Sequence, residues 1–166
     1  MIVREETAAD TAAITEVTIA AFRDHPLSNQ TEHLIVDALR AAGVLKVSLV
    51  AEIEERVVGH VAFSPVGISD GTGGWFGLGP VSVLPSYQKQ GVGKALIRKG
   101  LSMLKSMGAN GCVLVGDPAY YERFGFRNYP GLVYEGVPQE VFLALPFTEE
   151  VPSGTVEFHK GFRAGE

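Results

Sequence analysis

Apolar residues recur every three to four positions in three stretches of the chain, which is the spacing of an amphipathic helix. The first stretch follows Thr7 or Asp10, either of which can cap a helix, and it ends at a His-Pro pair because proline disfavours helical geometry in the residue before it. The second stretch covers 30–42 and the third covers 91–107, and a glycine directly follows each of them. A short fourth helix is predicted over 118–124.

In the remaining stretches the apolar period shortens to two, or the apolar residues form a short unbroken run, and both patterns are typical of strands. The predicted strands cover 1–5, 47–53, 57–66, 78–84, 111–116, 126–129 and 140–145. The short link between the second and third strands favours an antiparallel hairpin. Because proline cannot donate to a sheet ladder, Gly79-Pro80 predicts a bulge or an edge in the fourth strand. This order of elements predicts an α+β fold around a mixed sheet.

The length of 166 residues suits one domain with its own core. Val156, Phe158 and Phe162 predict that the tail, 146–166, docks on that domain. No apolar run reaches the roughly 18 residues of a membrane span, so no membrane partner is expected. Cys112 is the only cysteine, so no internal disulfide can form, and a reducing cytoplasm is the expected compartment.

Charge and glycine are distributed unevenly along the chain. The formal net charge is −5, which argues against a nucleic-acid partner. Residues 71–116, however, contain five Lys or Arg and no acidic residue, so this part carries +5 and the rest of the chain −10. Eight of the 20 glycines lie in 67–93. An anion-binding site is therefore predicted in the basic middle, and the loop 67–77 around Trp75 is either a substrate lid or an ordinary surface loop.

The predicted anion site lies where the fourth strand leads into the third helix. The first turn of a helix has unpaired N–H groups and a partial positive charge, and Gly91 and Gly93 would let a phosphate approach the backbone closely. A dinucleotide fingerprint fails because Leu96 stands where its third glycine belongs. A Walker loop fails because Gln88 replaces its first glycine and Ala95 its hydroxyl. A plain strand-to-helix connection stays open as the alternative.

Two motifs resemble those of one enzyme superfamily. Gln88, Gly91 and Gly93 form a Gln-x-x-Gly-x-Gly pattern that resembles the pyrophosphate arm of the GCN5-related N-acetyltransferase (GNAT) superfamily. The segment from Tyr121 to Phe126 is similar to the Tyr-x-x-x-Gly-Phe segment after the fifth strand of those enzymes. The resemblance covers about residues 1–145, and it extends to a subgroup of predicted bacterial acetyltransferases with unassigned substrates.

The resemblance implies a mixed, mostly antiparallel sheet of about six or seven strands flanked by helices, with a bulged and splayed fourth strand. It implies that 1–166 is a single N-acetyltransferase domain that moves an acetyl group from acetyl-CoA to a primary amine by direct attack. Pyrophosphate would lie on the backbone of 88–93 beside Lys94, and pantetheine would pair with the fourth strand. The implied cofactor-binding residues are Val81, Val83, Gln88, Lys89, Gln90, Gly91, Val92, Gly93 and Lys94.

The resemblance assigns the general acid but no general base. Tyr121 matches the superfamily tyrosine that protonates the thiolate, and a phenol with a pKa near 10 is mostly a proton donor at neutral pH. The alternative is that Tyr121 is an aromatic packing residue. The glutamate that some histone-type members use would fall on Gly77, so it is not carried over. His60, Glu52 and Asp117 are candidate bases, and each also has a purely structural interpretation.

Several alternatives remain open. Cys112 lies among apolar residues, so it is interpreted as a packing residue and not as a nucleophile. The four histidines have no metal-ligand spacing, so no metal is expected. The acidic remainder favours cationic acceptors such as polyamines, aminoglycosides or lysine side chains. A non-catalytic acyl-CoA sensor is the alternative function, and a homodimer is suggested because dimers are common in the superfamily.

Overall fold

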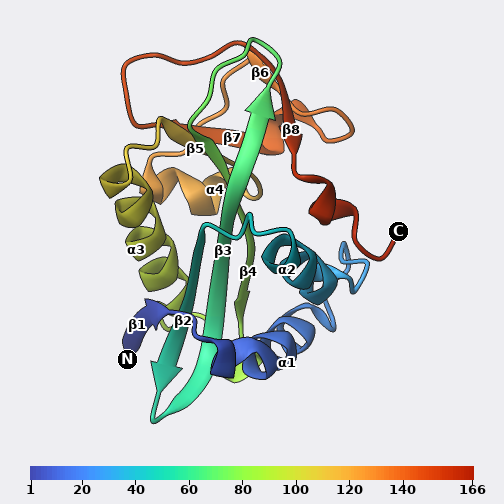
Figure 1. Cartoon of the computed structure of the whole chain (residues 1–166), viewed down its shortest axis with the longest axis vertical. Helices are drawn as coiled ribbons and strands as arrows, with labels where there is room; N and C mark the ends of the chain where they lie inside the picture. Colours follow the sequence, from blue (N-terminus) through green and yellow to red (C-terminus); the bar gives the residue numbers. More distant parts are fainter.

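The computed structural model describes residues 1–166 and consists of one twisted sheet with helices on both faces (Figure 1). The strands are β1 (Ile2–Glu5), β2 (Val47–Ile53), β3 (Arg56–Ile68), β4 (Trp75–Val83), β5 (Gly111–Val115), β6 (Leu132–Val133), β7 (Phe142–Pro146) and β8 (Gly154–Phe158). The helices are α1 (Thr11–Phe22), α2 (Glu32–Ala41), α3 (Val92–Ser106) and α4 (Pro118–Tyr121), with single 3-10 turns between some elements.

The strand order is β1-β2-β3-β4-β5-β7, and β8 pairs with both β3 and β6. In the main sheet only the β4–β5 pair is parallel. The predicted α+β fold with a mixed, mostly antiparallel sheet is therefore confirmed, with eight strands instead of six or seven. The additional strands are β6 and β8, and β8 is formed by the C-terminal tail lying antiparallel to the end of β3.

β4 is bulged and then separates from β5. Val81 lies opposite Val61 on β3 and Leu78 lies opposite Phe63, so three steps along β4 match two along β3. The extra residue falls at Gly79-Pro80, where proline cannot donate to the ladder. Parallel pairing with β5 is confined to the first three residues of β4, so the strands diverge beyond Gly77. The predicted bulge and splay are confirmed.

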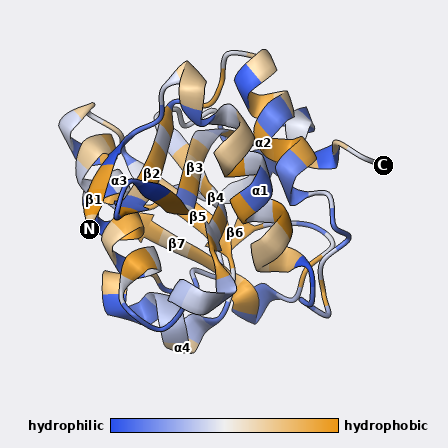
Figure 2. Ribbon diagram, turned by 90° about the horizontal axis from the view of Figure 1, so that it is seen from below, coloured by the Kyte–Doolittle hydropathy of each residue, from blue (hydrophilic) through white to orange (hydrophobic).

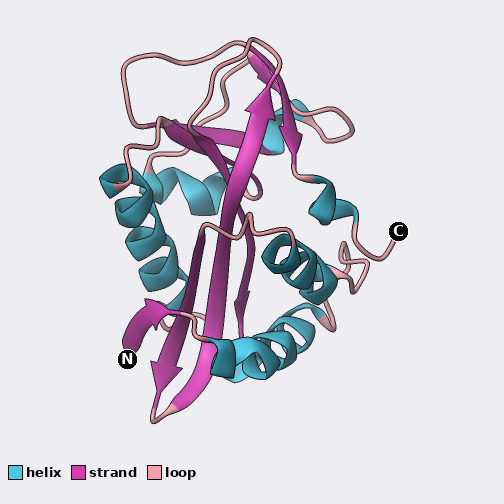
Figure 3. Ribbon diagram, in the orientation of Figure 1, coloured by secondary structure: helices cyan, strands magenta, loops and turns pink.

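The helices cover opposite faces of the sheet. α3 lies on one face, whereas α1 and α2 lie on the other (Figures 1 and 3). The α3 face packs closely: a Cβ added at Gly100 would lie 2.1 Å from the ring of Phe63 on β3. Figure 2 shows that the hydrophobic colour is concentrated in the strands between these helices. None of the helices is long and apolar enough to cross a membrane.

Two local predictions are wrong. Residues 126–129 form no strand, because only Arg127 bridges to Ala144 before the chain turns through a Pro-Gly pair into β6. The loop predicted over 67–77 is shorter, since β3 continues to Ile68 where β8 pairs with it. β4 begins at Trp75, whose side chain is buried against the backbone of Gly111.

Candidate functional site

The divergence of β4 and β5 opens a cleft of about 490 Å³ in the middle of the sheet. Its walls come from β4, from the ends of α1 and β5, and from α3 and α4. Of the predicted cofactor-binding residues, Val81, Val83, Gln88 and Gly93 line this cleft, and Tyr121 lines it too. The fold therefore brings together residues that are up to 40 positions apart in the sequence.

Backbone groups of β4 face the open side of the cleft. The N–H of Leu84 donates to the carbonyl of Val58 on β3 at 2.8 Å. Backbone groups alternate in direction along a strand, so those of Val81 and Val83 point away from β3 and toward the space that β5 has left. The carbonyl of Val83 accepts a hydrogen bond from the Nε2 of Gln88 at 3.1 Å. The edge of β4 thus resembles an exposed strand edge with hydrogen-bonding groups available to a ligand.

The loop between β4 and α3 forms a basic cradle at the helix start. Gly91 adopts φ +87°, a left-handed conformation that favours glycine, and α3 begins at the next residue with no acidic side chain in its first turn. The Nε2 of Gln90 donates to the carbonyl of Ser86 at 3.1 Å and so closes the loop. Lys89 and Lys94 add positive charge on either side of this turn. The helix start is therefore suited to an anion.

The remaining predicted cofactor-binding residues do not line the cleft. Lys89, Gln90, Gly91 and Lys94 lie on the loop and the first turn of α3 beside it. The side chain of Val92 is buried in the core, where it packs against Gly59 of β3, so only its backbone can serve a ligand.

Tyr121 lies on α4, and its ring packs closely on the backbone of Gly116, the residue that follows β5. A Cβ added at Gly116 would lie 2.5 Å from Cε2 of Tyr121, and the ring stacks edge-on against Tyr120 at 4.9 Å between centroids. Burial raises the pKa of Tyr121 to about 12. The phenol is therefore protonated throughout the neutral range and can only donate a proton there.

The three candidate bases each have a structural role. His60 is fully buried, with Nε2 2.8 Å from Oγ of Ser48, and burial lowers its pKa to about 4. Glu52 pairs with Arg4 at 2.6 Å. Asp117 accepts the N–H of Ala119 and so caps α4, and it is the one candidate base that lines the cleft.

A second, smaller pocket of about 240 Å³ meets the cleft at the point where β4 and β5 diverge. The two pockets share Phe22, Leu78, Gly79, Pro80 and Val115. The second pocket is otherwise lined by Ile35, Tyr134, Phe158, Phe162 and a single acidic residue, Glu32. Sequence reasoning missed Glu32, because an acidic residue in the first turn of a helix is an ordinary helix feature.

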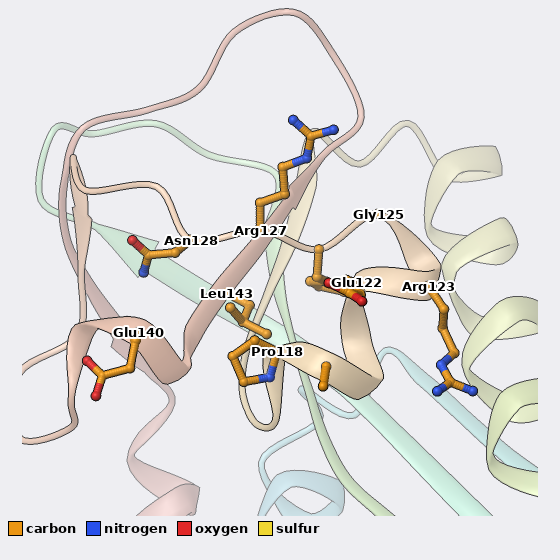
Figure 4. Close-up of a pocket in the computed structure, with 10 residues that line it drawn as sticks. Pro118, Glu122, Arg123, Gly125, Arg127, Asn128, Glu140 and Leu143 are labelled. Carbon is orange, nitrogen blue, oxygen red and sulfur yellow. The ribbon is translucent and has the colours of Figure 1, made fainter.

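A hollow of about 730 Å³ lies on the other side of α4 (Figure 4). It is lined by Arg123, Arg127, Glu122 and Glu140 among others, and it shares no residue with the cleft. Figure 4 shows the guanidinium groups of the two arginines pointing apart. Arg123 donates to the carbonyl of Tyr120 at 2.7 Å, so its charge is held against α4 and not in a shared anion site.

Cysteine and metal chemistry find no support in the geometry. Cys112 is fully buried, and burial raises the pKa of its thiol far above the ordinary value, so it remains a thiol. No group of three or more His, Cys, Asp or Glu side chains is placed to hold a metal ion.

The splayed sheet, the glycine-rich helix start and the cleft between them define an acetyltransferase fold. Residues 45–128 match the family model described as an acetyltransferase (GNAT) domain, and the chain belongs to this family. It is 36% identical to the uncharacterized N-acetyltransferase YhbS of Escherichia coli K12 over 172 aligned positions, which cover 98% of each chain. The resemblance to the GNAT superfamily is thus confirmed.

Two solved structures are similar over almost their whole length. A GNAT family acetyltransferase from Brucella melitensis, solved in complex with acetyl-CoA, is 50% identical with a TM-score of 0.87, and the match covers 97% of each chain. The structure of Escherichia coli YhbS in complex with CoA is 31% identical by structural alignment with a TM-score of 0.86. That match covers 99% of this chain and 93% of YhbS.

Proposed function

We propose that this chain transfers the acetyl group of acetyl-CoA to a primary amine by direct attack, with residues 1–166 acting as one N-acetyltransferase domain. The observation that carries the proposal is the meeting of two pockets where β4 and β5 diverge. One pocket leads to the basic start of α3, and the other is apolar with one carboxylate. Two substrates entering from these two sides would meet without a covalent enzyme intermediate.

Acetyl-CoA occupies the larger cleft in this proposal. Its pyrophosphate lies on the N–H groups of residues 88–93 with Lys89 and Lys94 nearby, where the helix start favours negative charge. Its pantetheine arm pairs with the backbone of Val81 and Val83 along the open edge of β4. The complexes of the Brucella and Escherichia relatives with acetyl-CoA and CoA support this assignment.

The reaction needs an electrophile, a nucleophile and a proton donor. The neutral amine attacks the thioester carbonyl, the C–N bond forms, and the N–H of Val83 stabilises the oxyanion. The C–S bond then breaks, Tyr121 gives its proton to the leaving thiolate, and the phenol is reprotonated by the proton that the attacking nitrogen loses. Because the pKa of Tyr121 is about 12, the phenol enters the reaction protonated and can act as the donor.

Binding and turnover are measured separately to test the proposal. We expect acetyl-CoA to raise the melting temperature of the protein, and a panel of primary amines to release free thiol from acetyl-CoA in a protein-dependent way. Stabilisation without thiol release on any amine would favour an acyl-CoA sensor, a function to which the structural roles of His60, Glu52 and Asp117 lend weight. The absence of any stabilisation by acetyl-CoA would contradict both functions.

A further inference from the structure

We infer that the acceptor is a small monoamine with an apolar body, whose ammonium group binds Glu32 among the aromatic side chains of the second pocket. The inference rests on the proposed function, since it assigns the acceptor of the same site. It extends that function from primary amines in general to one chemical class. It also replaces the polycationic acceptors that the acidic composition favours.

Glu32 is a carboxylate without a cationic partner. It lies in the first turn of α2, half-buried, and both of its carboxylate oxygens accept from the hydroxyl of Ser28, at 2.7 and 2.8 Å. It forms no ion pair, whereas Glu6 pairs with Arg40, and Asp10 and Glu52 pair with Arg4. A cation stabilises a carboxylate that is partly removed from water more than a fully hydrated one, because the cation offsets the lost hydration.

Four aromatic side chains line the pocket beside Glu32. The rings of Tyr134 and Phe158 are 4.9 Å apart between centroids, those of Phe158 and Phe162 are 5.0 Å apart, and Phe22 of α1 lines the same pocket. Ring faces attract an ammonium group, and ring bodies bury a hydrocarbon chain or ring. A carboxylate in an aromatic pocket is thus complementary to a ligand with one positive charge and an apolar body.

Size and charge argue against larger polycations. The pocket volume of about 240 Å³ lies below the roughly 300–1,000 Å³ of sites for drug-sized ligands. Because Glu32 is its only charged residue, a second ammonium group of a polyamine or an aminoglycoside would lie among apolar side chains without a partner. The acidic residues Asp70, Glu149 and Glu150 line a different hollow and cannot supply that partner.

The pocket is placed to deliver the amine to the thioester. It shares Gly79, Pro80 and Val115 with the cleft that we assign to acetyl-CoA. An amine bound beside Glu32 would therefore lie next to the point where β4 and β5 diverge. An ammonium group cannot attack a carbonyl until it loses a proton. In this arrangement Glu32 accepts that proton and later releases it to solvent, which leaves a neutral amine as the nucleophile.

The test compares amines and carboxylate variants. Initial rates of thiol release are measured with 2-phenylethylamine, spermidine, kanamycin and an Nα-acetylated lysine peptide. They are measured for the wild type, for Glu32→Gln and for Glu16→Gln, an exposed α1 carboxylate that makes no hydrogen bond or ion pair.

We expect 2-phenylethylamine to have the highest kcat/KM. Glu32→Gln should lower that value by roughly tenfold to a hundredfold, the range for a hydrogen bond to a charged group, with the KM for acetyl-CoA unchanged. Glu16→Gln should behave as the wild type.

A binding measurement separates this inference from the proposed function. Calorimetry of 2-phenylethylamine with the CoA-loaded protein needs no turnover, and we expect binding that Glu32→Gln weakens and Phe158→Leu weakens less. Binding without acetyl transfer would support the pocket and contradict the proposed activity. The inference is overturned if the amine does not bind, if Glu32→Gln and Glu16→Gln bind it equally, or if spermidine, kanamycin or the peptide has the highest kcat/KM.

Discussion

The two faces of the central sheet are built from different chemistry. The face under α3 carries large apolar side chains, such as Leu49 and Phe63, which belong to a cluster of 19 buried hydrophobic residues. Under α1 and α2 the other face has an apolar cluster of three buried residues, and a cluster of eight lies further along the sheet, where β8 pairs with β3. The same strands place polar side chains on that second face, because neighbouring residues of a strand point to opposite sides. These buried polar residues are Ser48, His60, Ser64 and Ser82.

The second face is held by a chain of polar contacts that ends on α2. His60 contacts Ser48, the hydroxyl of Ser48 donates to Glu6, and Glu6 forms an ion pair with Arg40 at 2.9 Å. Three polar atoms on this face, Nδ1 of His60 and the hydroxyls of Ser64 and Ser82, have no hydrogen-bond partner. The α3 face is thus a close-packed support for the basic cradle at the start of α3. The other face depends on hydrogen-bond geometry and protonation, and it carries the helices α1 and α2, which line the second pocket.

The largest expected effect concerns Tyr121, the proposed proton donor in the larger cleft. Tyr121→Phe keeps the ring that packs on Gly116 but removes the hydroxyl, so we expect the maximal rate of thiol release to fall by roughly 10²–10⁴-fold, the usual range for a general acid. Stabilisation by acetyl-CoA should persist, because the cradle is untouched. Tyr120→Phe is the matched control from the same cleft and should lose far less rate. Equal rates for Tyr121→Phe and the wild type would refute the assignment.

The second expected effect is a pH dependence of stability that comes from the polar face. Burial lowers the pKa of His60 to about 4 from an ordinary 6.5, so the unfolded chain binds a proton more readily than the folded one between these values. Stability is therefore complete above about pH 6.5 and is lost as the pH falls toward 4, by about 3 kcal/mol in all. The charged groups that face His60 are Glu6 and Arg40.

Chemical denaturation at a series of pH values measures this loss. Hydrogen bonds from Arg40 and Ser48 lower the pKa of Glu6, so its contribution to stability is complete above about pH 4.5 and is lost only as the pH falls below that value. The interval between pH 5 and 6.5 therefore isolates His60. His60→Gln, which cannot titrate, should show a flat stability across that interval. A slope as steep as that of the wild type would assign the dependence to another group.

The bulged strand and the glycine-rich helix start were largely predictable from the sequence because their signals are local. The glycines and lysines of the cradle lie within one short run, and Pro80 indicates the bulge of β4 within its own strand. The second pocket was not predictable, because Phe22, Glu32 and Phe158 come from three segments that only tertiary structure brings together. Glu32 has no local signal that separates it from other acidic residues at helix starts.

The failed local predictions have the same cause. Trp75 lies in a glycine-rich segment that is typical of a loop, yet its side chain is buried over Gly111, a residue 36 positions away. The pairing of β8 with β3 likewise depends on a contact between distant segments, and it extends β3 beyond its predicted end. Tertiary pairing thus outweighs local propensity at both places.

The third expected effect tests whether the cradle depends on its backbone conformation. Gly91→Ala places a Cβ at φ +87°, which costs about 1–2 kcal/mol, and distorts the start of α3. The loop of the free variant relaxes from this conformation and acetyl-CoA binding must restore it, so we expect the KM for acetyl-CoA to rise roughly five- to thirtyfold, as that energy implies. Gly43→Ala is the matched control, since Gly43 also has a left-handed φ and open space around a new Cβ but follows α2. It should lose stability with no change in KM for acetyl-CoA, and equal KM values for both variants would contradict the cradle.

The smallest expected effect distinguishes satisfied from unsatisfied polar groups on the second face. Ser64 is fully buried and its hydroxyl has no partner, so Ser64→Ala should raise the free energy of unfolding by up to about 1 kcal/mol. Ser48→Ala is the same substitution on the same face, but it removes the hydroxyl that joins His60 to Glu6 and should lower stability instead. Denaturant melts at pH 7.5 compare the two. If Ser64→Ala is as destabilising as Ser48→Ala, the hydroxyl of Ser64 has a hydrogen-bond partner in solution. The contrast between the two faces would then not include unsatisfied polar groups at Ser64.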